Sequence, residues 1–127
     1  NLGQAMTIIA GRRPEFAVPS GEDELTCPMT LLGGDGVISV VSNVDPAGMV
    51  RMDRAARAGD AAGARAEHYR LLPLIRALFA ETNPVPAKAA MARLGLLEDV
   101  VRPPLAPAGA ATRQKLDEGL RLARLAQ

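Results

Sequence analysis

The fold of this chain is decided by one stretch, LGGDGVISVV at positions 32–41. Its first half is a glycine-rich turn, and its second half is a run of apolar, mostly β-branched residues. Such a continuous apolar run is typical of a strand that is buried on both faces, as the strands of a parallel sheet are. The stretch therefore predicts a turn that leads into a buried strand over residues 37–41.

The residues before this stretch predict the same order of elements. Residues 2–10 predict a short helix, and residues 15–19 predict a second strand, closed by a serine and a glycine. Three acidic residues at 22–24 stand where a helix over residues 22–32 begins, and the helix dipole favours negative charge there. Helices that alternate with strands across tight turns indicate a parallel α/β architecture.

After residue 45 the sequence predicts helices only. Asp45-Pro46 predicts a helix start, with a side-chain cap and a proline in the first turn, and Gly59 predicts its end. Residues 61–80 predict a long helix, in which Pro73 predicts a kink. Its apolar residues fall on one face at helical spacing, so this face is expected to be buried. The face comprises Leu71, Leu74, Ile75, Leu78 and Phe79.

Two shorter helices are expected nearer the C-terminus. Asn83-Pro84 predicts the start of a helix that covers residues 87–94, and the proline-rich residues 102–109 predict an irregular segment. Thr112 is expected to cap the final helix, whose buried face comprises Leu116, Leu120 and Ala123. Because two strands alone do not make a stable sheet, further strands are expected to come from outside this sequence.

Composition excludes several classes of protein. The formal net charge is +1 and no basic run occurs, so no nucleic-acid partner is expected. No apolar stretch approaches the roughly 18 residues that cross a bilayer, so a soluble protein without a membrane partner is expected. The single cysteine, Cys27, fits the reducing cytoplasm. The first residue is not methionine, and the sequence is expected to start inside a longer chain.

Several motifs resemble the dihydrodipicolinate synthase family in order and spacing. They are SGED at 20–23, LGGDGVISV at 32–40 and ETNPVPAK at 81–88, with weaker matches in LLPL at 71–74 and RPPL at 102–105. The resemblance implies an α/β fold: residues 1–58 form the C-terminal portion of a TIM (β/α)8 barrel, namely strands 7 and 8 with flanking helices. Residues 59–127 then form a C-terminal helical domain.

The same resemblance implies a lyase of lysine and diaminopimelate biosynthesis. Family members condense pyruvate with aspartate semialdehyde to 4-hydroxy-tetrahydrodipicolinate through a lysine Schiff base, without a metal or other cofactor, as cytoplasmic homotetramers. The resemblance places that lysine just before Asn1, so the chain needs the missing N-terminal half of the barrel as its partner. Lys88 and Lys115 are the only lysines here, and neither is expected at a strand end. We expect no catalytic residue in this chain, and no activity from it alone.

Six positions are implied as site residues. By resemblance, the Ile38 backbone and Gly21 line the pyruvate pocket at the ends of the two strands. Around them, the residues expected in supporting roles are Ser20, Glu22, Asp23 and Asn43. Without the resemblance, the acidic residues among them are explained more simply by their place in the first turn of a helix.

Other reactive side chains favour ordinary structural roles. His68 is the only histidine and has no second ligand at metal spacing, so no metal site is expected. Cys27 has no basic neighbour that lowers its pKa, and it is expected to be a small buried residue. Two alternatives stay open. One is another pyruvate-dependent aldolase, of the sialic acid lyase or keto-deoxy-sugar aldolase type, and the other is a non-catalytic helical assembly module.

Overall fold

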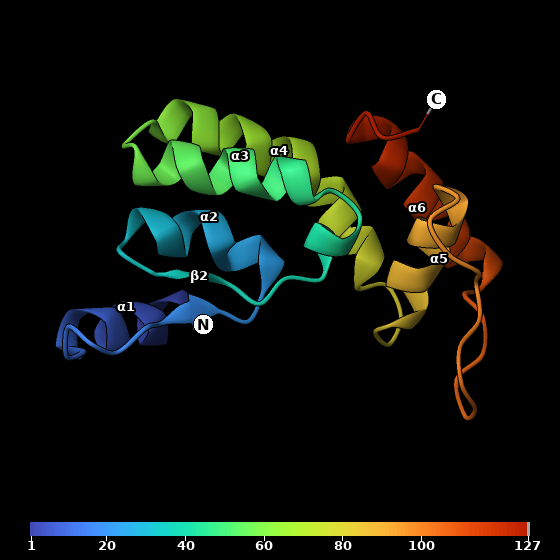
Figure 1. Cartoon of the computed structure of the whole chain (residues 1–127), viewed down its shortest axis with the longest axis horizontal. Helices are drawn as coiled ribbons and strands as arrows, with labels where there is room; N and C mark the ends of the chain where they lie inside the picture. The colour runs from blue at the N-terminus through green and yellow to red at the C-terminus, as the bar shows by residue number, and fades with distance from the viewer. Residues whose placement is uncertain (127) are drawn as a thin grey trace.

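The computed structural model describes residues 1–126, which form six α-helices, a short 3-10 helix and two short strands. Figure 1 shows α1, α2, α3 and the strands on one side and α5 and α6 on the other, with α4 running between them. The elements are, in order, α1 (Leu2–Gly11), β1 (Pro19–Ser20), α2 (Asp23–Leu31), β2 (Gly36–Val37), η1 (Val41–Asn43), α3 (Pro46–Arg57), α4 (Ala61–Leu78), α5 (Val85–Arg93) and α6 (Ala110–Leu122).

The two strands pair in parallel, as the alternation of helix and strand predicts. Ser20 lies opposite Val37, and the Ile38 amide donates to the Ser20 carbonyl at 2.8 Å. The predicted lengths, 15–19 and 37–41, are wrong, because each strand has only two paired residues. Residues before β1 form a turn instead, in which the Phe16 amide donates to the Arg13 carbonyl at 2.9 Å.

The second predicted strand is also less buried than its sequence indicates. Ile38 is 75% exposed, whereas Val41 is fully buried but belongs to the 3-10 helix η1. Among the described residues the sheet has two strands, so β2 pairs with another strand along one edge only. A hydrophobic run therefore indicates a tendency to be buried, whereas the length of a strand depends on the neighbouring strands that pair with it.

The core lies around α4, which packs against α2, α3, α5 and α6. Leu71, Leu74 and Leu78 of its predicted face are completely buried, and Ile75 is 2% exposed. The prediction that Phe79 shares this buried face is wrong: Phe79 is 47% exposed, because the helix ends at Leu78 and the chain turns away. The face predicted for the last helix, with Leu116, Leu120 and Ala123, is confirmed as buried.

The predicted helix starts have mixed outcomes. Asp45 caps α3, since its carboxylate accepts from the Gly48 amide at 2.8 Å, and Gly59 follows that helix with a φ of +78°. The Asn83-Pro84 prediction is wrong, because α5 begins at Val85 and Pro84 takes the cap position. The Thr112 prediction is wrong too, because α6 begins at Ala110, two residues earlier.

A distant carboxylate contacts the start of the same helix. The Gly109 amide, at the start of α6, donates to Oε1 of Glu81, which follows α4, at 3.0 Å. A bond from Thr112 and this bond from Gly109 lower the pKa of the Glu81 carboxyl, as expected for an acid beside a helix N-terminus. Sequence proximity favours Thr112 as the polar group at this helix start, but tertiary packing brings the Glu81 carboxylate to the Gly109 amide.

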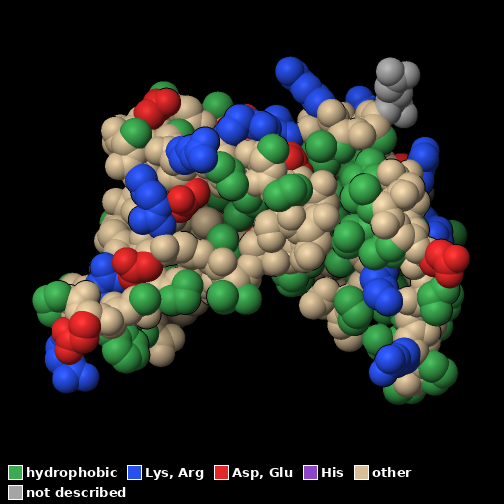
Figure 2. All heavy atoms as spheres, viewed as in Figure 1, with side chains coloured by type: hydrophobic (Ala, Val, Ile, Leu, Met, Phe, Trp, Pro, Cys, Tyr) green, Lys and Arg blue, Asp and Glu red, His purple; other side chains and the backbone are tan. Residues whose placement is uncertain are grey.

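The two sides of the molecule leave a concave outline between them. Figure 2 shows this notch along the edge of the molecule, with hydrophobic side chains along its border. None of the helices in the described part of the chain combines the length and the apolar character that crossing a membrane requires. The predicted boundary at residues 58 and 59 falls in the turn between α3 and α4, and it stays a prediction.

Candidate functional site

The candidate site lies where β1 and β2 end. Because the strands are parallel, their carboxyl ends meet at one edge, and the segments that follow them lie side by side. The first segment runs from Ser20 to Asp23, and the second runs from Ile38 to Asn43. All six residues predicted for the site therefore lie on two adjacent segments, although 15 positions of chain separate Asp23 from Ile38.

Asp23 joins the two segments. Its side chain is 1% exposed, and Oδ2 accepts from the Val40 amide at 2.8 Å and from the Val41 amide at 3.1 Å. Helix-start electrostatics alone does not explain this residue, because its carboxylate bonds to the other segment and not to its own helix. Among the described residues Oδ1 has no hydrogen-bond partner, so the carboxylate keeps one free acceptor beside the strand ends.

The neighbouring polar residues stabilise the same edge locally. Ser20 is buried, and its hydroxyl donates to the Glu22 carbonyl at 2.7 Å and accepts from the Glu22 amide at 3.1 Å. Asn43 is exposed, and its side-chain amide donates to the Val40 carbonyl at 3.0 Å. Glu22 precedes α2 without a side-chain cap bond, and it is exposed. These bonds shape the backbone of the site.

Gly21 and Ile38 are the open positions of this edge. No atom lies within 4 Å of the place where a Cβ on Gly21 would stand, and Ile38 is largely exposed. On one side of Gly21 a groove of about 390 Å³ extends to α4, which contributes Ile75 and Arg76 to its wall, and to Phe79, which follows this helix. Arg76 donates to Glu24 at 2.7 Å across the groove.

Neither lysine reaches this edge. The Lys88 ammonium group donates to the Val100 carbonyl at 2.6 Å and so holds the segment after α5, while Lys115 lies on α6. A Schiff base forms at an amine that faces the substrate pocket, and in barrels the pocket lies at the carboxyl ends of the strands. The described part of the chain therefore offers no lysine amine at the candidate site.

Cys27 is buried, as predicted, and His68 is half-buried on α4. Cys27 is 5% exposed, and burial raises the pKa of its thiol, which disfavours the reactive thiolate. Burial lowers the pKa of His68, against the opposing effect of Glu24. In residues 1–126 no three His, Cys, Asp or Glu side chains come together in a way that could hold a metal ion.

Comparison with known proteins identifies the family. Residues 1–123 match the model of the dihydrodipicolinate synthetase family. The chain belongs to this family. A curated relative, the 4-hydroxy-tetrahydrodipicolinate synthase of Methanococcoides burtonii, is 50% identical over 117 residues, which is 91% of this chain and 40% of the relative. The chain thus spans about two fifths of the length of the curated relatives that it matches.

Solved structures of the family share the fold described above. The dihydrodipicolinate synthase of Aquifex aeolicus is 42% identical with a TM-score of 0.92, over 98% of this chain and 43% of that structure. The chloride-inhibited dihydrodipicolinate synthase of Acinetobacter baumannii, solved in complex with pyruvate, is 33% identical with a TM-score of 0.93, over the same shares. The predicted resemblance to the family is confirmed, and so is the α/β fold of this portion.

The groove wall from α4 is the part of the site that sequence reasoning missed. Helical spacing predicts Ile75 and Phe79 only as members of an apolar face, and it does not distinguish Arg76. Their position beside Gly21 depends on how α4 crosses α2. Helical spacing predicts which residues share a face but not which loop that face meets, so no signal in the sequence identifies them.

Proposed function

We propose that this chain forms the C-terminal part of an enzyme that condenses pyruvate with aspartate semialdehyde to 4-hydroxy-tetrahydrodipicolinate. Family membership supports the proposal most directly, since relatives that carry this name match nearly the whole chain. In this proposal β1 and β2 are the seventh and eighth strands of a TIM barrel. Their carboxyl ends then belong to the face on which barrel enzymes place their active sites.

The proposed chemistry is covalent and uses a lysine from the residues that this sequence does not contain. Its amine condenses with the pyruvate carbonyl and releases water, and the resulting Schiff base loses a methyl proton to give an enamine. The enamine carbon then attacks the aldehyde carbon. The amino group of the semialdehyde next displaces the lysine from the Schiff-base carbon, which closes the ring and frees the lysine amine. In this scheme the electron sink is the protonated Schiff base, so the proposal includes no metal or other cofactor.

The proposed role of this chain is to wall the pyruvate pocket. Gly21 leaves room at the end of β1, and the backbone at Ile38 follows β2 directly on the same edge. Asp23 holds these two segments together through the Val40 and Val41 amides. Ser20, Glu22 and Asn43 support the loops. The similarity to the Acinetobacter baumannii synthase, whose structure is a complex with pyruvate, supports the choice of substrate.

A chimera tests the proposal. In it, this chain replaces the matching part of the Methanococcoides burtonii synthase, to which it is 50% identical. We expect the folded chimera to consume pyruvate and aspartate semialdehyde, and borohydride to trap pyruvate on a lysine outside this chain. Treatment with a chelator is expected to leave the rate unchanged. A folded chimera that turns over a keto-deoxy sugar acid or a sialic acid but not aspartate semialdehyde would contradict the proposed substrate.

The chain by itself is the matched control. We propose that it is inactive alone, because neither Lys88 nor Lys115 lies at the strand ends. Mass spectrometry after incubation with pyruvate and borohydride is expected to show no adduct on this chain. An adduct on either lysine would overturn this part of the proposal. The proposed assembly is a homotetramer, which sedimentation of the chimera checks.

A further inference from the structure

A buried aspartate lies at each end of the segment that leaves β2. Asp23 binds the Val40 and Val41 amides at its start. At its far end stands Asp45, which is 4% exposed and whose amide donates to the Val41 carbonyl at 2.9 Å. The turn between them contains η1 and closely follows Ile38, so the position of Asp45 helps to fix the wall of the candidate pocket.

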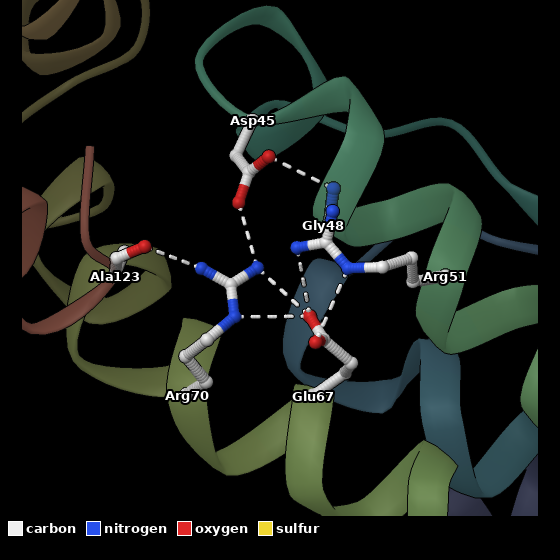
Figure 3. Close-up of polar contacts among 6 residues, drawn as sticks. All are labelled: Asp45, Gly48, Arg51, Glu67, Arg70 and Ala123. Atoms are coloured by element: carbon white, nitrogen blue, oxygen red, sulfur yellow. Dashed lines mark hydrogen bonds and ion pairs between the residues drawn. The ribbon is translucent and has the colours of Figure 1, made fainter.

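Arg70 of α4 holds Asp45 in turn. Its Nη2 donates to Oδ2 of Asp45 at 2.7 Å, and its Nη1 donates to the Ala123 carbonyl, at the end of α6, at 2.5 Å. Figure 3 shows the guanidinium with Ala123 on its left and Asp45 above it. One side chain therefore joins the turn after β2 to the C-terminal helix.

The guanidinium has little freedom to turn. Glu67 accepts from its Nε at 2.9 Å and from its Nη2 at 2.8 Å, and the Arg70 side chain is only 17% exposed. A guanidinium is planar and holds five N–H donors in a fixed geometry, so its bonds fix how its partners lie relative to one another. A lysine ammonium group, whose three donors rotate, does not do this. Arg51 also binds Glu67, at 3.2 Å, but it is 53% exposed, and its side-chain bonds among the described residues go to Glu67 alone.

We infer that Arg70 is a positioning residue for the pyruvate site, through which the C-terminal end of α6 sets the turn that follows Ile38. The inference deepens the proposed function and rests on it. Arg70 acts through Asp45 and does not touch the substrate. When Arg70 is shortened, Asp45 keeps its bond to Gly48 but loses the contact that ties the turn to α6.

Steady-state kinetics of the chimera test this role. We expect Arg70→Met to raise KM for pyruvate by about 2- to 30-fold, the range typical of residues that modulate a site without contacting its ligand. A purely structural role would lower the amount of active enzyme, and therefore the apparent kcat, and would leave KM unchanged. Arg51→Met is the matched control, because it removes a partner of Glu67 without reaching Asp45, and its KM should stay at the parent value.

A second variant covers the case in which Arg70→Met does not fold. Asp45→Asn keeps a side-chain oxygen for the Gly48 amide but removes the charge that Arg70 binds. It should also raise KM for pyruvate. The KM of the double variant should be no higher than that of the more affected single variant. If both single variants leave KM unchanged, or if their effects on KM multiply fully, the inference is wrong.

Hydrogen exchange separates this inference from the proposed function. If the parent chimera is folded but inactive, the proposed function fails, and amide exchange of the chimera then decides the positioning role. Arg70→Met should speed exchange at residues 40–45 and leave residues 71–78 of α4 unchanged. Unchanged exchange at residues 40–45, or a uniform increase over both segments, overturns the inference.

Discussion

The N-terminal helix and the central helix contrast in how they bury their apolar residues. Helix α1 has no buried residue, and Met6 and Ile8 on it are each 45% exposed. Helix α4 buries six residues, three of them leucines without any exposed surface. The sequence is apolar in both places, so the difference lies in the neighbours. The helical part supplies its own core, whereas α1 and the strands have few partners among the described residues.

The largest expected effect follows from this contrast. Leu74→Ala should lower the free energy of unfolding by about 2–5 kcal/mol, because it opens a cavity at a completely buried site. Ile8→Ala, at a site with 45% exposure, should change it by less than about 0.5 kcal/mol. Urea denaturation of both variants measures the difference. Equal losses would show that α1 is packed as tightly as α4.

The second comparison concerns the two acidic residues of α2. Asp23→Ala leaves the half-buried Val40 amide and the buried Val41 amide without their acceptor and should cost about 1–3 kcal/mol. Glu24→Ala removes an exposed ion pair with Arg76 and should cost under about 1 kcal/mol. Urea denaturation together with exchange at residues 40 and 41 checks both values. A larger loss for Glu24→Ala would mean that the strand ends do not depend on Asp23.

Substitution of two glycines compares how closely α6 and α1 pack against their neighbours. A Cβ on Gly119 of α6 would stand 2.9 Å from the Leu74 Cα, so Gly119→Ala should cost about 1–2 kcal/mol as the helices move apart. No atom lies within 4 Å of the corresponding place at Gly11, where α1 ends. Gly11→Ala should therefore be neutral or slightly stabilising. Thermal melting of the two variants is the measurement, and a cost at Gly11 would reveal a contact on α1.

The smallest expected effect is the response to acid. Hydrogen bonds from the Val18 amide and Arg12 lower the pKa of Asp35, and bonds from Arg51 and Arg70 lower the pKa of Glu67 despite its partial burial. A carboxyl with a lowered pKa stabilises the fold at neutral pH and loses this contribution as the pH falls through its folded value. Stability should therefore drop as the pH falls below the ordinary pKa range of carboxyl groups.

Substitution of each carboxyl in turn shows which region of the molecule causes the response to acid. Glu67→Gln should flatten the dependence of unfolding free energy on pH more than Asp35→Asn, because the Glu67 side chain is less exposed, at 24% against 38%. Denaturation at a series of pH values is the measurement. The reverse order would indicate that the region around the two strands carries more of the electrostatic stability.

Local signals in the sequence predicted much of this structure. The helix start at Asp45, the helix end at Gly59 and the buried face of α4 up to Leu78 depend on side chains within a few residues of one another, and all three are confirmed. The family follows from short motifs in a fixed order. The six predicted site residues lie on two adjacent segments because parallel strands end at one edge, and their proposed roles stay predictions.

The features that the sequence does not determine depend on distant partners. The acceptor for the Gly109 amide at the start of α6 comes from Glu81, and the second bond of the Asp23 carboxylate comes from Val41. Arg70 joins residues that are 25 and 53 positions away from it. The exposure of Ile38 also depends on which residues lie near it in space, and the described residues leave most of it uncovered. Sequence patterns determine periodicity, caps and turns because these are local. Only the packed structure decides which groups meet, because burial and hydrogen bonding depend on distances in space and not along the chain.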